Sequence, residues 1–394
     1  MNILVLHNSY QIYGGEDSVV KYELDLLSRY GNTSILHLLE NGSITGWRKA
    51  ISTAFGVSHS KLGYEFSRKI LAETQPDVAH IHNFFPLLSP AVYEACQGVR
   101  VPVVQTLHNY RTICPGALLM KEGQICEKCV TSNPYQAVLH GCYRNSRLGT
   151  LAVARMVDYH RRRNTWGTKV DRFIALTEFA KKKFVEAGFP EHKIAVKPNF
   201  YSGAGVANHA EASESRVGAL FVGRMSQEKG IRTLLSAWRQ LSIPLKMAGG
   251  GPLLDEVRNA GLNTVETFGL LPPEQVSSAL SRAAFLVLPS ECYENFPLTL
   301  AEAFAHGLPV VASRLGAMAE IVEDGVTGLH FELGNADDLA AKVRWMNNHP
   351  DECRQMGYNA RRVFEQNYTP DRNYEMLMKI YREAIDEKKQ SRQS

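Results

Sequence analysis

The feature that most constrains the fold of this chain is a regular alternation of short apolar runs with amphipathic helical stretches. The first half contains NILVLHN, TSILHLL, DVAHIHN, VPVVQTLHN and RFIALTE, and the second half contains VGALFVG, PLKMAG, TVETFG, AFLVLPS, LPVVAS and TGLHF. Strands that are apolar at nearly every position are typical of parallel sheets covered by helices on both faces. The pattern predicts an α/β protein, and 394 residues suffice for two doubly wound, Rossmann-like domains.

The domain boundaries follow from breaks in this pattern. Residues 201–215, YSGAGVANHAEASES, are small and polar after the first tyrosine and predict a linker. We therefore assign residues 1–200 to a first domain, 216–370 to a second domain, and 371–394 to a terminal helix.

Ligands of open α/β sheets bind beyond the carboxyl ends of the strands, so the loops after the apolar runs are the candidate sites. Residues 289–313, PSECYENFPLTLAEAFAHGLPVVAS, place Pro297 at the expected first position of a short helix. The backbone N–H groups of such a helix start, around Phe296, Leu298 and Thr299, favour an anion.

Two carboxylates flank this helix start. Glu294 precedes it, and Glu302 lies about one turn into a helix that is otherwise apolar. A carboxylate rarely lies among apolar residues without a hydrogen-bonding partner. One interpretation is a surface glutamate favoured near a helix N-terminus. The other is that both carboxylates face one ligand that carries hydroxyl and phosphate groups.

Two cations are spaced for a similar purpose in GRMSQEKG. Arg224 ends a strand and Lys229 precedes the next helix, so both could meet one group beyond the sheet edge. Positioned cations stabilise the negative charge of a departing diphosphate. The chain has no Asp followed two residues later by another Asp, the metal clamp of metal-dependent sugar transferases, so we expect no catalytic metal. The alternative is a pair of solvated loop residues.

Glycine-rich turns follow two of the apolar runs. YGGEDS contains Gly14 and Gly15, and GGGPLLDE contains Gly250. Both could let the backbone approach a phosphate or a sugar closely, but an ordinary strand-to-helix turn explains each of them as well.

In this order, GGE, TLHNYR, GRMSQEKG, MAGGGP, FGLLPPEQV and PSECYENFPLTLAEAFAHGLPVVAS resemble the retaining, group 1 glycosyltransferases of family 4, over nearly the whole chain. The resemblance implies the GT-B fold, in which two Rossmann-like domains face a cleft and the C-terminal helix crosses back to the N-terminal domain. It also implies that the first domain binds the acceptor and the second a nucleotide sugar, in bacterial polysaccharide or glycolipid synthesis.

The resemblance further implies roles for single residues. Arg224 and Lys229 would hold the diphosphate of a UDP- or GDP-linked sugar. Glu302 would hold the ribose hydroxyls and Glu294 the donor sugar. The other donor-binding candidates are Gly14, Gly15, Gly250, Gly269, Leu271, Asn295, Phe296, Leu298 and Thr299. The family often has Gly-Phe-Gly where this chain has Asn295-Phe296-Pro297, so the contacts of that turn are expected to differ.

His108 matches a family histidine that lies beside the transferred sugar, and it joins Glu294, Arg224 and Lys229 as a catalytic candidate. Its neutral imidazole could hydrogen-bond a sugar hydroxyl or stabilise positive charge at the anomeric carbon. Without the resemblance, a histidine at a strand end is read as a structural residue. That reading is kept for His80 and His82.

Four of the seven cysteines fall in a loop of residues 111–143: Cys114, Cys126, Cys129 and Cys142. A Cys-two-residue-Cys pair with two flanking cysteines could bind a structural zinc ion. A redox or disulfide role and simple packing are the alternatives. An odd number of cysteines without an export signal favours reduced thiols.

The net charge of +4 is too small to argue for nucleic acid, which we do not expect as a partner. Residues 144–169 carry seven Arg and Lys against one Asp on a helical pattern. This is either a solvated helix face or a peripheral contact with anionic lipid headgroups, which would suit a lipid-linked acceptor. The N-terminus is expected to be a buried strand rather than a signal peptide, which indicates a cytoplasmic protein.

We therefore predict a retaining transfer of a hexosyl group from a nucleotide diphosphate sugar to a saccharide or lipid-linked acceptor. A sugar-nucleotide epimerase of GT-B architecture would bind the same diphosphate, but it needs acid and base residues around the sugar ring that the sequence does not place. A zinc-stabilised nucleic-acid-binding protein would explain the cysteines and arginines and leave the glutamate pair unexplained.

Overall fold

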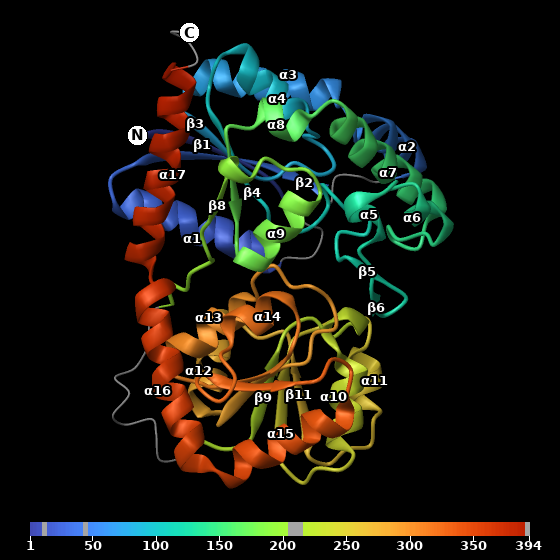
Figure 1. The fold of residues 1–394 in the computed structure, drawn as a ribbon, viewed down its shortest axis with the longest axis vertical. Coiled ribbons are helices and arrows are strands. Elements are labelled where there is room, and N and C mark those ends of the chain that lie inside the picture. The colour runs from blue at the N-terminus through green and yellow to red at the C-terminus, as the bar shows by residue number, and fades with distance from the viewer. Residues whose placement is uncertain (10–13, 42–45, 204–215, 391–394) are drawn as a thin grey trace. The chain divides into compact units, whose positions relative to one another are not determined.

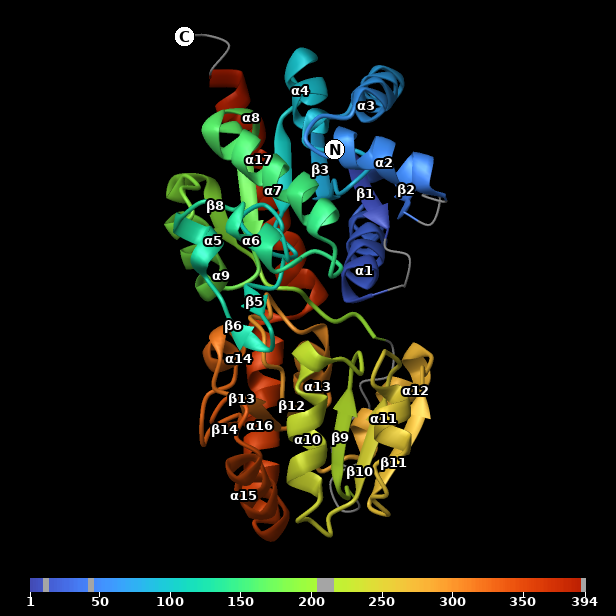
Figure 2. The same cartoon turned by 90° about the vertical axis from the view of Figure 1, so that its right-hand side faces the viewer.

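The structure is a computed structural model that describes residues 1–9, 14–41, 46–203 and 216–390. The predicted linker, 201–215, lies outside the described residues from residue 204 on. The chain forms two compact units. The first comprises Met1–Lys121, Cys126–Pro198 and Asn373–Ser394, and the second comprises Glu122–Ile125 and Asn199–Arg372. Figures 1 and 2 show that each unit consists of a sheet with helices packed on it.

The first unit is built on a parallel six-stranded sheet in the order β2-β1-β3-β4-β7-β8. Its strands are β1 (Asn2–Ser9), β2 (Thr33–Glu40), β3 (Val78–Asn83), β4 (Val103–Thr106), β7 (Arg172–Ala175) and β8 (Ile194–Val196). The central strands β3, β4 and β7 are buried throughout, whereas the edge strand β2 is partly exposed. The central position of these strands explains why they are apolar at nearly every residue.

The helices of this unit connect the strands as crossovers. They are α1 (Gly15–Arg29), α2 (Trp47–Gly56), α3 (Lys61–Thr74), α4 (Ala91–Gly98), α5 (Lys128–Thr131), α6 (Gln136–Leu139), α7 (Arg147–Arg162), α8 (Thr165–Lys169), α9 (Glu178–Glu186) and the 3₁₀ turn η2 (Glu191–Lys193). Three of them begin at a side-chain cap, in which Ser60, Ser146 or Thr177 accepts a hydrogen bond from the backbone N–H three residues on. A separate hairpin is formed by β5 (Met120–Lys121) and β6 (Gln124–Ile125).

The second unit has a parallel six-stranded sheet in the order β11-β10-β9-β12-β13-β14. Its strands are β9 (Ala219–Val222), β10 (Leu245–Ala248), β11 (Val265–Gly269), β12 (Phe285–Leu288), β13 (Val310–Ser313) and β14 (Gly328–Phe331). Its helices are η3 (Gln227–Lys229), α10 (Ile231–Trp238), α11 (Leu254–Arg258), α12 (Pro273–Arg282), α13 (Leu298–Ala305), α14 (Gly316–Ile321), α15 (Ala336–Asn348) and α16 (Pro350–Asn367).

The main core of the second unit lies between its sheet and the helices α10 and α15. Phe221 and Phe285 from the sheet meet Leu234 and Trp238 from α10 and Val343 from α15, all almost fully buried. Among the remaining helices of this unit, α13 packs against α12 and α16. Apolar residues at helical spacing on α10 and α15 thus bury one stripe of each helix against the sheet.

The last helix, α17 (Pro370–Gln390), starts in the second unit and packs with the first from Asn373 on. Tyr374 stacks on Tyr30 with ring centroids 3.8 Å apart. Near the C-terminal end of the helix, Glu387 forms an ion pair with Arg172 of β7. No helix of the described residues is long and apolar enough to cross a membrane.

The predicted fold class is confirmed, because the apolar runs of the sequence form two parallel, doubly wound sheets. The prediction missed the short strand β8 and the β5–β6 hairpin. It also placed Pro297 inside its helix, whereas Pro297 is the extended residue before α13.

Candidate active site

The predicted donor-site residues lie at the point where the strand order of the second unit reverses. The chain leaves β9 toward β10 and β11 and returns to β12 on the other side of β9. The loops after β9 and β12 therefore diverge from neighbouring strand ends, which is where doubly wound folds bind ligands. The loop after β9 carries Arg224 and Lys229, and the loop after β12 carries Glu294.

Lys229 and Glu294 form the central contact of this site. The Lys229 Nζ donates to Glu294 Oε1 at 2.5 Å, and the Ser290 hydroxyl donates to the same oxygen at 2.7 Å. Burial lowers the pKa of Lys229, but the Glu294 carboxylate and smaller contributions raise it by more, so the net shift is upward. The lysine is therefore a fixed cation at neutral pH.

Gly230 brings the two loops together. It adopts φ +68°, and a Cβ at this position would lie 1.8 Å from the carbonyl oxygen of Pro289. A residue with a side chain would push the η3 turn away from the end of β12. The position of Lys229 against Glu294 thus depends on the glycine that follows the lysine.

Arg224 has a different environment from Lys229. Its side chain is exposed, and no ion pair or side-chain hydrogen bond holds its guanidinium among the residues that the structure describes. The structure places Arg224 and Lys229 on the same loop, but only the lysine is positioned by a carboxylate.

Glu302 is the fifth residue of α13 and is half-buried. Burial raises the pKa of its carboxyl to about 7. The phenol of Tyr201 lies close enough for the Glu302 charge to raise the pKa of the tyrosine, after the larger effect of burial. A half-buried carboxyl of this kind gains from a polar partner such as a hydroxyl group.

The helix start beside it is partly as predicted. The backbone N–H of Leu300 already donates to Pro297 O at 3.0 Å, which leaves the amides of Leu298 and Thr299 as the first of the helix. Phe296 is buried and packs edge-on against Tyr368, with centroids 5.3 Å apart. Its side chain is a core residue, so only its backbone could contact a ligand.

The predicted glycine turns differ between the units. Gly249 and Gly251 have positive φ, and a Cβ on either would collide with the carbonyl of Gly223 or Met225. Gly250 accepts a hydrogen bond from the Met225 N–H at 2.8 Å, so this turn packs against the loop that carries Arg224. By contrast, Gly14 is extended, and open space surrounds the missing side chain of Gly15.

Two further donor-binding candidates follow the neighbouring strand β11. Gly269 ends that strand with φ +69°, and its carbonyl accepts from the Gly249 N–H at 2.7 Å. Leu271 is half-buried two residues later. Both therefore lie at the same edge of the sheet as Lys229 and Glu294.

In the first unit, His108 follows β4 and contacts His82 of β3. The His108 Nε2 and His82 Nδ1 lie 2.9 Å apart, and the rings stack with centroids 5.2 Å apart. Burial, and then the charge of His82, lowers the pKa of His108 well below its usual range. This shift favours the neutral imidazole of His108.

A buried ion pair lies behind the two histidines. Glu23 of α1 accepts from Lys197 Nζ at 2.6 Å, and its other oxygen lies 3.3 Å from His82 Nε2. Burial raises the pKa of Glu23, but Lys197, His82 and His80 together lower it well below its usual range. Sequence reasoning missed Glu23 and Lys197, although Glu23 falls on the apolar stripe of its helix, between Val19–Val20 and Leu26–Leu27.

The contacts do not fix the tautomers of these histidines. Glu23 Oε2 and His82 Nε2 lie 3.3 Å apart without forming a hydrogen bond. In the contact between His82 Nδ1 and His108 Nε2, either ring can be the donor. What the contact fixes is the orientation of the His108 ring.

Glu23, His80 and His82 also have the spacing of a metal site, since their ligand atoms lie within 4.8 Å of one another among the described residues. The surroundings do not suit a cation. The Lys197 ammonium already binds Glu23, and both ring nitrogens of His80 are hydrogen-bonded, to Tyr381 and Thr106, at 2.7 and 2.8 Å. We therefore interpret the group as a hydrogen-bond network.

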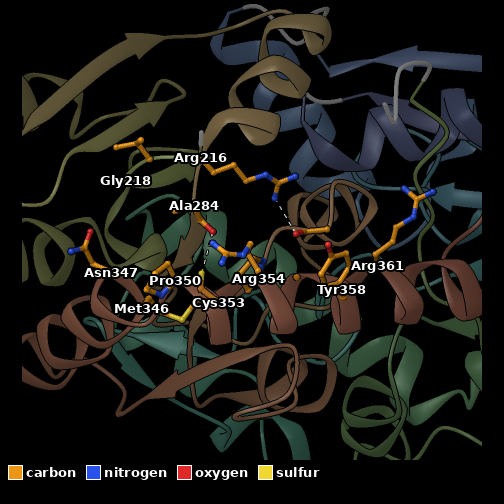
Figure 3. A pocket seen from close by; sticks show the side chains of 14 residues that line it. Arg216, Gly218, Ala284, Met346, Asn347, Pro350, Cys353, Arg354, Tyr358 and Arg361 are labelled. Atoms are coloured by element: carbon orange, nitrogen blue, oxygen red, sulfur yellow. Dashed lines mark hydrogen bonds between the residues drawn. The ribbon is translucent and has the colours of Figure 1, made fainter. Parts of the chain in front are cut away.

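A cavity of about 290 Å³ lies elsewhere in the second unit (Figure 3). It is lined by residues that precede β9, β12 and β13 and by α15 and α16, so it lies at the amino ends of the strands. Arg216 at its rim donates to the carbonyls of His306 and Gly307, at 2.7 and 3.0 Å. The strand ends that carry Lys229 and Glu294 are at the opposite edge of the sheet.

Comparison with known proteins agrees with this arrangement. Residues 208–363 match the family described as "Glycosyl transferases group 1", and residues 48–202 match "Glycosyltransferase Family 4". The chain is 26% identical to an uncharacterized glycosyltransferase of Methanocaldococcus jannaschii over 339 residues, which cover 84% of this chain and 82% of the relative.

Shorter matches connect it to two named transferases. It is 28% identical to the O-antigen chain mannosyltransferase C of Escherichia coli over 175 residues, 43% of this chain and 47% of that protein. It is 30% identical to the D-rhamnosyltransferase WbpZ of Pseudomonas aeruginosa over 179 residues, 44% of this chain and 47% of that protein. The chain thus spans about half the length of each.

Solved structures share its fold. HepE of Anabaena superposes with a TM-score of 0.64 at 16% identity, covering 96% of this chain and 98% of HepE. A glycosyltransferase of Rickettsia africae superposes with a TM-score of 0.69 at 16% identity, covering 98% and 99%. These matches do not favour an epimerase or a nucleic-acid-binding protein. With two sheets of the GT-B type and both halves matched, the chain belongs to the group 1, family 4 glycosyltransferases.

Proposed function

We propose that this enzyme transfers a hexosyl group, with retention of configuration, from a nucleotide diphosphate sugar to a saccharide or lipid-linked acceptor. The observation that carries the proposal is the Lys229–Glu294 pair at the point of strand reversal in the second unit. A fixed cation beside a carboxylate suits a ligand that joins a diphosphate to a sugar. The HepE structure, which is a complex with UDP and glucose, supports the same class of donor.

In this proposal the cations and the carboxylates have separate tasks. Lys229 and Arg224 stabilise the charge that develops on the departing diphosphate. Glu294 and the half-buried Glu302 accept hydrogen bonds from sugar and ribose hydroxyls. No residue is required to act as a carboxylate nucleophile, because the leaving phosphate can take the acceptor proton, and no catalytic metal is invoked.

His108 is proposed to contact the transferred sugar. The contact with His82 orients its ring, and burial lowers its pKa well below the usual range. A neutral imidazole can form a hydrogen bond with a sugar hydroxyl without changing its charge.

The acceptor class has support from the surface of the first unit. On α7 the exposed side chains include Leu148, 81% exposed, as well as Arg147 and Arg155. Phe55 of α2, the helix that packs against α7, is 73% exposed. Exposed apolar side chains near arginines suit contact with anionic lipid headgroups. We therefore propose peripheral contact with the cytoplasmic face of the membrane, where a lipid-linked acceptor would lie.

The proposal is tested by measuring the release of nucleotide diphosphate from a panel of UDP- and GDP-linked sugars, which needs no acceptor. Lys229→Met is expected to lower the rate by about 10²-fold or more, the usual cost of one donor to a developing oxyanion. The matched control is Arg232→Met, since Arg232 is an exposed residue paired only with Glu256 among the described residues. Equal rates for the two variants, with both folded by circular dichroism, would contradict the site assignment.

A further inference from the structure

The strongest feature that the glycosyl transfer does not use is the cysteine loop, residues 111–143, which holds Cys114, Cys126, Cys129 and Cys142. It contains little regular structure: the two-residue strands β5 and β6 and the four-residue helices α5 and α6 (Figure 1). All four thiols are free, with Cys114 and Cys129 buried and the other two half-buried. A segment of this kind has too small an apolar core of its own to fix its backbone.

The four thiols come together in the folded loop. Cys129 lies close enough to Cys114, Cys126 and Cys142 for their charges to act on it. Gly116 lies between two of them, because a Cβ there would be 3.5 Å from the Cβ of Cys142 and 3.8 Å from the Cys114 sulfur. Residues 28 positions apart in sequence therefore face one space, which spacing alone did not establish.

The turn after Cys114 folds the loop back on itself. The Ala117 N–H donates to the Cys114 carbonyl at 2.9 Å, and the Cys126 N–H donates to Leu119 O at 2.8 Å. The turn therefore brings Cys126 back toward Cys114.

This turn contains backbone strain. Ala117, Leu119 and Glu122 have φ values of +66°, +48° and +50°, a left-handed conformation that residues other than glycine rarely adopt. Such residues persist where the surrounding structure over-determines them. Three within the thirteen residues from Cys114 to Cys126 indicate that something besides local preference holds this loop.

The loop is held at its middle and at its base. The guanidinium of Arg161 in α7 donates to the carbonyls of Cys129 and Val130, at 2.8 and 3.1 Å. At the base of the loop, Arg111 lies over the ring of Tyr143, next to Cys142, with 5.0 Å between its Cζ and the ring centroid. These contacts fix the backbone beside Cys129 and Cys142.

We propose that Cys114, Cys126, Cys129 and Cys142 bind one structural Zn²⁺ ion. Four thiolates complete a tetrahedral shell, so no coordination position remains for substrate or water, and the ion has a structural role. Binding releases the thiol protons to solvent, and the positive ion then stabilises the thiolates that would otherwise repel one another. The proposal does not depend on the proposed function.

The distances show what binding would require. A zinc–sulfur bond of about 2.3 Å places tetrahedral sulfurs about 3.8 Å apart. The four sulfurs are farther apart than this. Among the described residues, the potential ligand atoms that lie within 4.8 Å of one another belong to Glu23, His80 and His82, and not to the cysteines. The short turns between the cysteines must therefore close around the ion.

The test is the metal content of the purified full chain, measured by elemental analysis after dialysis against zinc-free buffer. We expect about one zinc per chain. Cys126→Ser combined with Cys129→Ser should reduce it to near zero. Cys353→Ser is the matched control, because that cysteine is also buried but lies in α16, and it should keep the full zinc content.

A second measurement covers the case in which the double variant fails to fold. The wild-type chain, refolded with Co²⁺ in place of zinc, should show the visible absorption bands of a tetrahedral thiolate site. Less than about a tenth of an equivalent of zinc, both as purified and after incubation with ZnCl₂, would overturn the proposal, since structural sites bind tightly. Disulfides found among the four cysteines, or loss of zinc in Cys353→Ser, would also overturn it.

Discussion

Replacing Lys197 by methionine should destabilise the first unit strongly. Lys197 and Glu23 have side chains only 1% and 3% exposed, and 2.6 Å separates Nζ from Oε1. Removing one partner of a buried ion pair costs about 3–5 kcal/mol, because the other charge stays buried without compensation. Lys197 also donates to Asn373 of α17 at 3.0 Å, so the same change weakens the attachment of the C-terminal helix.

The assay is urea unfolding followed by hydrogen exchange in peptides of α1 and α17, which reports on the first unit separately. Lys197→Met combined with Glu23→Leu should recover most of the loss, because two apolar residues replace the buried pair. Lys69→Met is the control, since Lys69 forms an exposed pair with Glu73 and should change stability by less than about 0.5 kcal/mol. A loss below about 1 kcal/mol in Lys197→Met, or no recovery in the double variant, would refute the reasoning, because a buried pair cannot be broken that cheaply.

Three further predictions concern pH and backbone. Burial is the largest of the effects that lower the pKa values of His80, His82 and His108 in the folded chain. Below about pH 6.5 the unfolded chain therefore binds more protons than the folded chain. The stability of the first unit should fall there by up to about 4 kcal/mol per pH unit, which calorimetry between pH 7 and 5 checks. Glu302 has the opposite sign, because its raised folded pKa costs stability as pH rises from about 4.5 to 7. Glu302→Gln should therefore stabilise the chain by about 1–3 kcal/mol at pH 8 and by much less at pH 5, while it slows nucleotide release; equal effects at both pH values in thermal unfolding would contradict the assignment. Gly230→Ala should reduce activity as severely as Lys229→Met, because its Cβ would collide with Pro289 O, and a near-normal release rate would show that the η3 turn tolerates displacement.

The sheets could be predicted from the sequence because each central strand is buried on both faces and therefore apolar along its length. β8 was missed for the converse reason: it has three residues, two of them half-buried, and precedes a polar stretch. The β5–β6 hairpin has two residues per strand, too short for any periodicity to be detected.

The candidate site residues of the second unit and those of the first differed in how well the sequence predicted them. Arg224, Lys229 and Glu294 each lie within a few residues of a strand end, so the rule for open sheets located them. The network behind His108 joins α1, β3 and the end of β8, and Glu23 pairs with a lysine 174 residues away. The available signal was a carboxylate on the apolar stripe of α1, which is costly unless a partner is buried with it. Nothing in the sequence identified Lys197 as that partner.

The contact between Lys229 and Glu294 also changes the net charge of the proposed donor site. The two side chains neutralise each other, so the pair as a whole offers a diphosphate little net attraction. The remaining attraction comes from Arg224, which is exposed, and from the amides at the start of α13. In the proposed reaction, Arg224 is therefore suited to bind the incoming donor, and Lys229 to stabilise the charge that develops on the leaving diphosphate. Removing Lys229 does more than delete a cation, because Glu294 then faces the diphosphate as an uncompensated carboxylate. That is why the loss in Lys229→Met should exceed the loss in Arg224→Met, although both changes remove one positive charge.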